Sequence, residues 1–235
     1  MKRFCLTNEE LGGEFSKSPK NLIERAQELN NITDNIQKSE SIALVGNSST
    51  LLDHSYGKLI DSHDYVIRFN IAIIDGYEKY VGSKTSYRWI CSKMFLGLGM
   101  GNYSSYDVNF LPNLKEKHFL IYKWPHPQFT QGMKKNYHSK TNIHFLNKKS
   151  HELVNNTKVL HTNTVSSGGA AVVLASHLSD NVSLFGFNFL KDTRSSFHYF
   201  EDTRKASRTA HDFTSEKRYI DSLVKQEKVN YYKCA

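Results

Sequence analysis

The fold is decided by residues 41–85, which read SIALVGNSSTLLDHSYGKLIDSHDYVIRFNIAIIDGYEKYVGSKT. Residues 42–45 (IALV) and 65–67 (YVI) are short apolar runs of the kind that form buried strands. In an open α/β sheet, ligands bind beyond the carboxyl ends of the strands, where polar residues follow both runs. An ordinary turn is the alternative for the first of these loops. The candidate ligand contacts are Asn47, Ser48 and Asn70.

A second pattern of strand, helix and strand lies further along the chain. Residues 158–161 (KVLH) and 181–185 (NVSLF) are predicted strands, and 170–178 (AAVVLASHL) is a predicted helix. Serine hydroxyls can cap the helix, and Gly168 and Gly169 let a ligand approach the backbone. The helix dipole favours a phosphate there. The candidate contacts are Ser166, Ser167, Gly168, Gly186 and Phe187.

The rest of the chain continues the α/β rhythm, which is typical of a parallel sheet. Residues 86–91, 118–123 and 229–233 are predicted strands, and 217–228 is a predicted helix. An amphipathic helix is expected at 21–35, where it covers the domain.

Composition limits the class of partner. The 235 residues suit one α/β domain, and 31 Lys and Arg against 23 Asp and Glu give a net charge of +8. Such a surface favours anionic partners, whether nucleic acid, anionic lipid or a phosphorylated or carboxylated substrate. No apolar run reaches the ~18 residues of a membrane-spanning helix. The odd, scattered cysteines Cys5, Cys91 and Cys234 argue against a disulfide framework and a cysteine zinc site, and a reducing cytosol is expected.

Four segments resemble, in the family's order, the sialyl motifs of animal-type sialyltransferases. They lie at 46–85 (large motif), 166–187 (small), 198–201 (third) and 211–216 (very small). The resemblance implies an α/β fold, a Rossmann-like variant of the GT-A type with a mostly parallel twisted sheet and helices on both faces. The matching residues include Gly46, Asn47, Ser48, Asp61, Arg68, Asn70, Gly82, Ser83, Lys84, Thr85, Ser166, Ser167, Gly168, Asp180, Gly186, Phe187, His198, Tyr199, Phe200, Glu201, His211 and Glu216.

The resemblance also implies a reaction: inverting transfer of sialic acid from CMP-sialic acid to a hydroxyl of an acceptor glycan, expected to end in galactose. The sequence has no Asp-x-Asp, the usual divalent-ion signature of nucleotide-sugar transferases, so no metal and no cofactor are expected. The expected partners are the CMP-sugar donor and an oligosaccharide or glycolipid acceptor.

Roles for individual residues follow from the resemblance together with their chemistry. His211 is the expected general base, because histidine titrates near neutral pH. His198 is expected to stabilise the leaving phosphate, assisted by Tyr199. Glu201 and Glu216 are supporting residues, with Glu216 either orienting His211 or serving as a local cap. The expected donor-binding residues are Asn47, Ser48, Asn70, Ser166, Ser167, Gly168, Gly186, Phe187 and Tyr199.

The chain departs from the animal pattern in two ways. Ile42 and Ser179 occupy the positions of the two cysteines that form a disulfide in those enzymes, and residues 1–45 contain no apolar run of membrane-anchor length. We therefore expect a compact bacterial or viral member in the cytoplasm, with peripheral association at the inner membrane face as an option. The expected domains are a lead-in at 1–40 and a catalytic domain at 41–235, whose 93–157 region varies with the acceptor.

Other functions remain open at this stage. The donor sugar can be Kdo, because the motifs read CMP rather than the sugar. A silent CMP-binding or glycan-binding module is a different class, disfavoured by the presence of both His198 and His211. A nucleic-acid binder is disfavoured because the lysines are dispersed and no RNA motif occurs.

Overall fold

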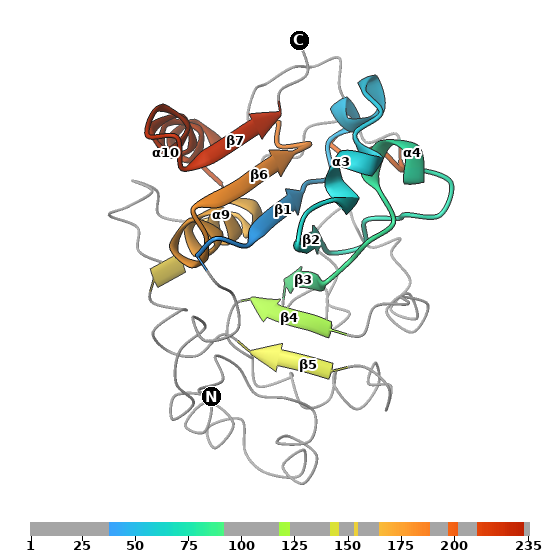
Figure 1. Ribbon diagram of the computed structural model, residues 1–235, viewed down its shortest axis with the longest axis horizontal. Coiled ribbons are helices and arrows are strands. Elements are labelled where there is room, and N and C mark those ends of the chain that lie inside the picture. The colour runs from blue at the N-terminus through green and yellow to red at the C-terminus, as the bar shows by residue number, and fades with distance from the viewer. Residues whose placement is uncertain are drawn as a thin grey trace, which may run out of the picture. The chain divides into compact units, whose positions relative to one another are not determined.

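The computed structural model describes seven segments of the chain (Figure 1). The chain divides into two compact units, Met1–Asn35 with Ser86–Glu152, and Ile36–Thr85 with Leu153–Ala235. The described segments are residues 38–91, 118–122, 142–145, 153–154, 165–188, 197–201 and 211–232.

The second unit contains four parallel strands in the order β2-β1-β6-β7. They are β1 (Ser41–Val45), β2 (Tyr65–Phe69), β6 (Asn181–Phe185) and β7 (Val229–Tyr232). In β1, β2 and β6 the last four residues are all buried, as expected of apolar runs covered on both faces. All four strands were predicted from sequence, and their carboxyl ends lie at one edge because they are parallel.

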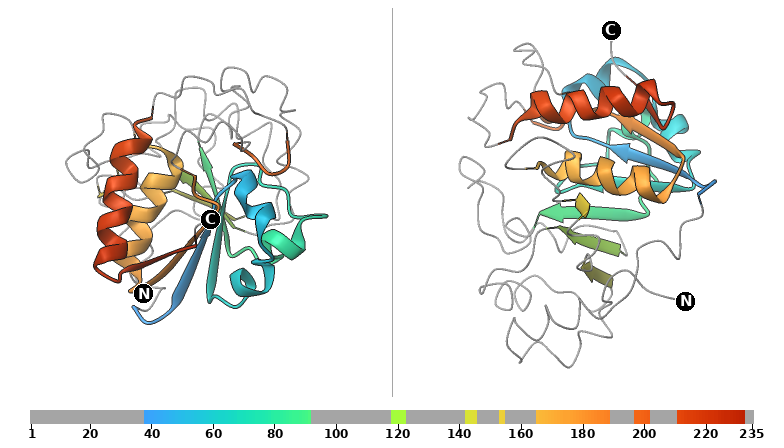
Figure 2. Two further views of the ribbon diagram at one scale, coloured as in Figure 1. Left: turned by 90° about the horizontal axis from the view of Figure 1, so that it is seen from above. Right: turned by 90° about the vertical axis from the view of Figure 1, so that its left-hand side faces the viewer.

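Helices cover both faces of these strands (Figure 2). On one face lie α9 (Ser167–Leu178) and α10 (Phe213–Lys225). On the other lie the short helices η2 (Ser49–Asp53), α3 (Gly57–Asp61) and α4 (Glu78–Val81). The parallel sheet with helices on both faces confirms the predicted fold class.

The two long helices place their N-termini at the edge where β1, β2 and β6 end. A short turn connects α9 to β6 and α10 to β7. Each helix therefore runs antiparallel to the strand that follows it. The α9 helix is buried at eight of its twelve positions, whereas α10 buries Glu216, Ile220 and Leu223. Among the described residues, no helix is long and apolar enough to span a membrane.

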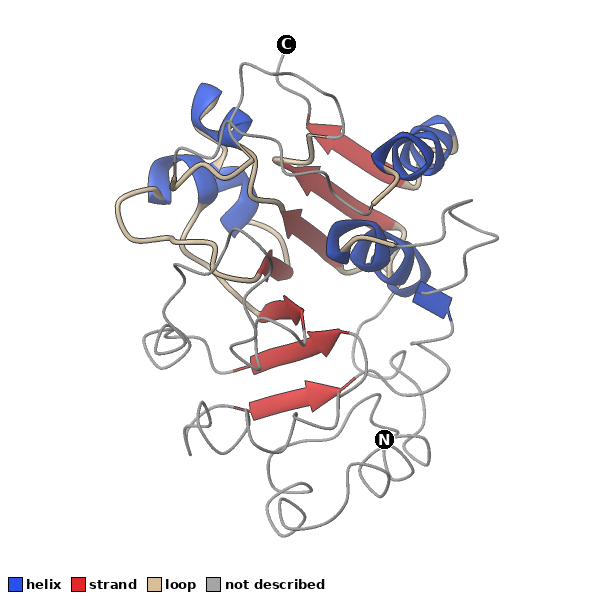
Figure 3. Ribbon diagram, turned by 180° about the vertical axis from the view of Figure 1, so that it is seen from behind, coloured by secondary structure: helices blue, strands red, loops and turns tan. Residues whose placement is uncertain are grey.

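The first unit contains three parallel strands in the order β3-β4-β5 (Figure 3). They are β3 (Tyr87–Cys91), β4 (His118–Tyr122) and β5 (Asn142–Phe145). The sequence predicted β3 and β4 but not β5, which is only four residues long and lies in a lysine-rich stretch. The predicted helix at 21–35 and strand at 158–161 lie outside the described residues.

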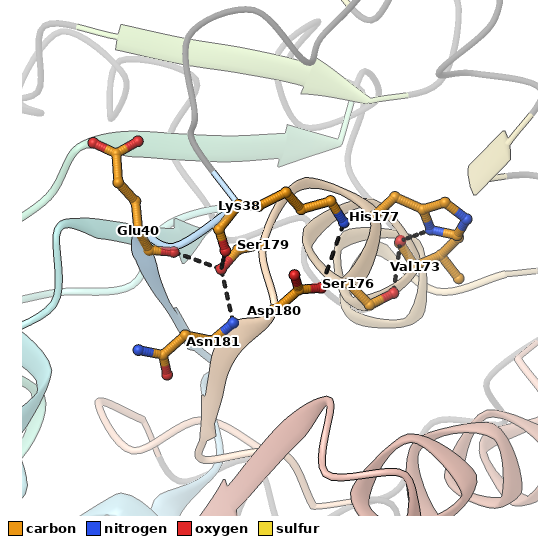
Figure 4. A network of polar contacts seen from close by, with 8 residues as sticks. All are labelled: Lys38, Glu40, Val173, Ser176, His177, Ser179, Asp180 and Asn181. Carbon is orange, nitrogen blue, oxygen red and sulfur yellow. Dashed lines mark hydrogen bonds and ion pairs between the residues drawn. The ribbon is translucent and has the colours of Figure 1, made fainter.

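Polar contacts surround Ser179, one of the two positions where the resemblance implied a cysteine in the animal enzymes (Figure 4). Ile42 is fully buried in β1. The Ser179 hydroxyl donates to the Glu40 carbonyl at 2.5 Å and accepts from the Asn181 N–H at 2.9 Å, and the N–H of Asp180 donates to the carbonyl of Lys38 at 3.0 Å. Hydrogen bonds therefore connect the entrance to β1 with the turn between α9 and β6.

The end of the 41–85 stretch is organised by one carboxylate. Asp61 accepts hydrogen bonds at 2.9 Å from the Ser83 N–H, the Ser83 hydroxyl and the Lys84 N–H. The fully buried Arg68 donates to the Lys84 carbonyl at 2.9 Å and to the Thr85 hydroxyl at 2.9 Å. Burial acts to raise the pKa of Asp61, but the Ser83 and Lys84 hydrogen bonds and the Arg68 charge outweigh it, so the pKa lies below its ordinary value.

Candidate active site

The loops after β1 and β2 meet through Asn47. Its carbonyl accepts from the Tyr199 N–H at 2.7 Å, and its side-chain nitrogen contacts the Phe69 carbonyl at 3.5 Å. The side-chain oxygen of Asn47 is buried and has no hydrogen-bond partner among the described residues. Asn70 has a left-handed backbone with φ 48°, which turns the chain at the end of β2. An unpaired buried amide oxygen is a ready acceptor for a ligand donor.

Glycines allow the loops after β1 and β6 to touch. The Gly46 N–H donates to the Phe185 carbonyl at 2.8 Å, and the Ser48 N–H donates to the Gly186 carbonyl at 3.2 Å. A Cβ on Gly46 would lie 2.4 Å from the Gly186 carbonyl oxygen, and Gly186 has φ +65°. The Ser48 hydroxyl caps η2 by accepting from the Thr50 N–H at 3.3 Å.

Phe187 lies between the end of β2 and the start of α9. Its ring meets that of Phe69 edge-on, with centroids 5.9 Å apart. A Cβ on Gly168 would lie 3.1 Å from Cε1 of Phe187, so the first turn of α9 borders the ring. Among the described residues, no hydrogen bond reaches the N–H of Ser167 or Gly168, two of the donors left free at a helix start.

The third motif holds a histidine against a carboxylate and a ring. His198 Nδ1 contacts Glu201 Oε1, and the imidazole stacks on Phe200 at 5.1 Å with planes 11° apart. Tyr199 is buried, and its hydroxyl donates to the Ile73 carbonyl. The Tyr199 hydroxyl thus holds the loop that contains Ile73. His198 is partly exposed, with 17% of its side chain accessible.

The start of α9 is held by a carboxylate from α10. Glu216 is fully buried; its Oε1 accepts from the Ser166 N–H at 2.7 Å and its Oε2 from the Ser166 hydroxyl at 2.6 Å. A Cβ on Gly169 would lie 2.7 Å from the Glu216 carboxyl carbon, so Glu216 fills the space that the sequence suggested for a ligand. Burial raises the pKa of Glu216 above its ordinary value, although the Ser166 hydrogen bonds and the His211 charge oppose this shift and Asp212 adds to it.

His211 stands immediately before the cap of α10. Asp212 is the N-cap, with Oδ1 accepting from the N–H groups of Thr214 and Ser215 at 3.1 Å. The predicted start of this helix at residue 217 is wrong by four residues, because the apolar spacing begins later than the Asp212 cap. Glu216 accepts from Ser166 at the start of α9, and the positive charge of His211 acts to lower the pKa of Glu216. The predicted role of Glu216 in orienting His211 stays a prediction.

Hydrogen bonds join the four motif segments within one unit. Phe69, which contacts Phe187 and Asn47, was not predicted from the sequence as part of the site. Its position just before Asn70 at a strand end could have indicated it. The joining pairs are Asn47 with Tyr199, Ser48 with Gly186, and Ser166 with Glu216.

The structure is an α/β domain in which hydrogen bonds join four loop segments beside a parallel sheet. The family model of glycosyltransferase family 29 (sialyltransferase) matches residues 6–228. Because the match covers nearly the whole chain, the protein belongs to this family.

Two curated relatives illustrate the range of the family. A β-1,6-galactosyltransferase of Arabidopsis thaliana is 31% identical over 210 residues, which cover 78% of this chain and 50% of the relative. The CMP-N-acetylneuraminate-β-galactosamide-α-2,3-sialyltransferase 1 of Gallus gallus is 29% identical over 241 residues, covering 92% of this chain and 68% of the relative. The chain thus spans half of the plant relative and about two thirds of the chicken one.

Solved structures agree on the fold. A crystal structure of a mammalian sialyltransferase has a TM-score of 0.66 at 21% identity, covering 94% of this chain and 81% of the other. A second one, in complex with Gal-β-1,3-GalNAc-ortho-nitrophenol, has a TM-score of 0.61 at 23% identity, covering 84% and 70%.

Proposed function

We propose that the protein transfers sialic acid from CMP-sialic acid to a hydroxyl of an acceptor glycan, with inversion and without a metal ion. The observation that carries this proposal is the hydrogen-bonded connection of the four motif segments at one edge of a parallel sheet in a family 29 member. Ligands bind at that edge in open α/β sheets.

The donor site is proposed at the loops after β1, β2 and β6 and the start of α9. The buried oxygen of Asn47 would accept from the nucleotide. The N–H groups of Ser167 and Gly168 would donate to the phosphate, which the helix dipole also favours. The Phe187 ring would pack beside the cytidine. Ser48, Asn70 and Gly186 would shape the loops around it.

His211 is the proposed general base that takes the proton of the acceptor hydroxyl. It lies at the N-terminal end of α10, which the Glu216–Ser166 hydrogen bonds fix against α9. Before the donor binds, the His211 charge and the Glu216 carboxylate are close enough to interact. Such a positioned base accelerates a reaction by typically about 10²–10⁴-fold.

His198 is the proposed partner of the leaving phosphate. A doubly protonated His198 would donate from Nδ1 to Glu201 and from Nε2 to the phosphate oxygen, where negative charge grows in the transition state. Stacking on Phe200 fixes the ring plane. The Tyr199 hydrogen bond to the Ile73 carbonyl would hold this loop in place. His198 would then donate to the leaving phosphate, and His211 would accept the proton of the acceptor hydroxyl.

The acceptor is proposed to be a galactose-terminated oligosaccharide or glycolipid. The net charge of +8 suits an anionic donor and an acceptor at an anionic membrane face, where the protein would bind peripherally on the cytoplasmic side. A second candidate is galactosyl transfer, which the 31% identity to the plant galactosyltransferase favours.

The test is nucleotide release by the purified protein in chelator, with CMP-sialic acid, CMP-Kdo or UDP-galactose as donor. Gal-β-1,3-GalNAc serves as acceptor and is omitted from the control. The proposal predicts acceptor-stimulated CMP release from CMP-sialic acid only. Release from CMP-Kdo or UDP-galactose alone would reassign the donor. CMP binding without any release would indicate a silent module, and a rate restored by a divalent ion would overturn metal independence.

A further inference from the structure

The one proton of the Ser166 hydroxyl is used inside the protein. It donates to Glu216 Oε2 at 2.6 Å and accepts from the Gly169 N–H at 3.0 Å. A serine hydroxyl carries one proton. While Glu216 is a carboxylate, that proton points at Glu216, and Ser166 cannot donate to a bound phosphate.

Protonation of Glu216 would reverse this bond without breaking the network. A carboxylic acid has one O–H donor and keeps acceptor capacity on its other oxygen. Oε2–H would donate to the Ser166 hydroxyl oxygen, and Oε1 would still accept from the Ser166 N–H. The serine oxygen would then accept twice, from Glu216 and Gly169, and its own proton would be free to turn toward a ligand.

The surroundings of Glu216 make this protonation accessible. Among the described residues, its contacts at the start of α9 are the uncharged Ser166 and Gly169, and the charged or titratable groups that act on it are His211 and Asp212 at the start of α10. Burial already disfavours the carboxylate. A phosphate at the start of α9 would add a like charge close by, which favours the neutral acid further.

We propose that donor binding is coupled to uptake of one proton by Glu216, and that this proton converts the Ser166 hydroxyl into a hydrogen-bond donor to the donor's phosphate. The proton comes from solvent, sits on Oε2 while the nucleotide is bound, and returns to solvent when CMP leaves. This inference rests on the proposed function, and it makes Glu216 a proton-linked positioning residue.

The test is calorimetric titration of CMP into wild type and Glu216→Gln from pH 6 to 8, in two buffers of different ionisation enthalpy. The glutamine amide can imitate the acid, donating to the Ser166 oxygen while its carbonyl accepts from the Ser166 N–H. Asp221→Asn is the matched control, because it removes a carboxylate that pairs with Lys217 on the same helix. Titration of the CMP phosphate, with a second pKa of about 6, is common to all three proteins.

Wild type and Asp221→Asn should take up more protons than Glu216→Gln, by up to one. Their affinity for CMP, divided by that of Glu216→Gln, should fall as pH rises, by at most about tenfold per pH unit. In wild type and Asp221→Asn, but not in Glu216→Gln, CMP should add a protonated-carboxyl band to the infrared difference spectrum. Equal proton uptake in Glu216→Gln, or no such band, would overturn the inference. Absence of CMP binding in all three proteins would overturn the proposed function itself.

Discussion

Asp61 and Glu216 are both motif carboxylates that accept hydrogen bonds from a backbone N–H and a serine hydroxyl, yet their pKa values move in opposite directions. Asp61 is partly exposed and has the positive charge of Arg68 nearby. Glu216 is fully buried, and within the described segments its hydrogen bonds come from Ser166. The fold therefore favours the charged form of one carboxylate and the neutral form of the other.

The difference separates the motif residues into two kinds. Around Asp61 they hold the loop at 82–85 against β2, which is a structural task. Around Glu216 they hold the start of α9, where the proposed donor phosphate binds. Membership in a motif therefore does not make a residue a ligand contact.

The largest effect is expected at His211. His211→Ala should lower kcat by about 10²–10⁴-fold and leave CMP affinity nearly unchanged, because it removes only the proposed base. His177→Ala, at the opposite end of α9, is the matched control and should keep wild-type turnover. Steady-state kinetics with calorimetric CMP binding measure both quantities. An unchanged turnover in His211→Ala would show that His211 is not the general base.

The two glycines at the start of α9 offer a matched pair. Gly169→Ala places a methyl group against the buried Glu216 carboxylate and should cost about 1–3 kcal/mol in unfolding free energy, with a loss of turnover. In Gly168→Ala the new methyl group would lie 3.1 Å from the Phe187 ring, which can shift slightly, and 3.7 Å from the Ser166 hydroxyl oxygen, an ordinary contact, so the stability cost should be smaller. Denaturant unfolding compares them. Equal stabilities would contradict the tight packing of Glu216 against α9.

Asp61→Ala should destabilise the fold by roughly 1–3 kcal/mol, because the N–H groups of Ser83 and Lys84 lose their acceptor. Turnover of the folded fraction should remain near wild type. Asp53→Ala, an exposed aspartate on η2, is the control. Asp61→Ala with full stability and impaired chemistry would move Asp61 from the structural region to the site.

The smallest effects are expected in the pH dependence of stability, where the two carboxylates should differ in sign. The pKa of Asp61 is lowered in the fold, so its contribution is present above about pH 4 and is lost as pH falls through its folded pKa. The stability advantage of wild type over Asp61→Asn should therefore shrink in acid.

The pKa of Glu216 is raised, so its contribution is complete below its ordinary pKa of about 4.3 and is lost as pH rises through the folded value. Wild type should lose stability relative to Glu216→Gln as pH rises. Denaturant unfolding from pH 3 to 8 measures both differences. If both stability differences changed with pH in the same direction, the opposite pKa shifts of Asp61 and Glu216 would be wrong.

Local patterns were sufficient for the strands around the site, because each is an apolar run bounded by glycine or polar residues. They failed where the structure depends on distant partners. The Ser166–Glu216 contact spans 50 residues and leaves no local signal, and β5 lies in a stretch dominated by lysines. The start of α10 was missed because Asp212, not apolar spacing, sets it.

The decisive measurement is transfer of sialic acid to the acceptor. The protein is incubated with CMP-sialic acid and Gal-β-1,3-GalNAc in chelator, and acceptor mass and free CMP are followed together. We expect an acceptor carrying one added sialic acid for each CMP released. An unchanged acceptor in the presence of bound CMP would contradict it.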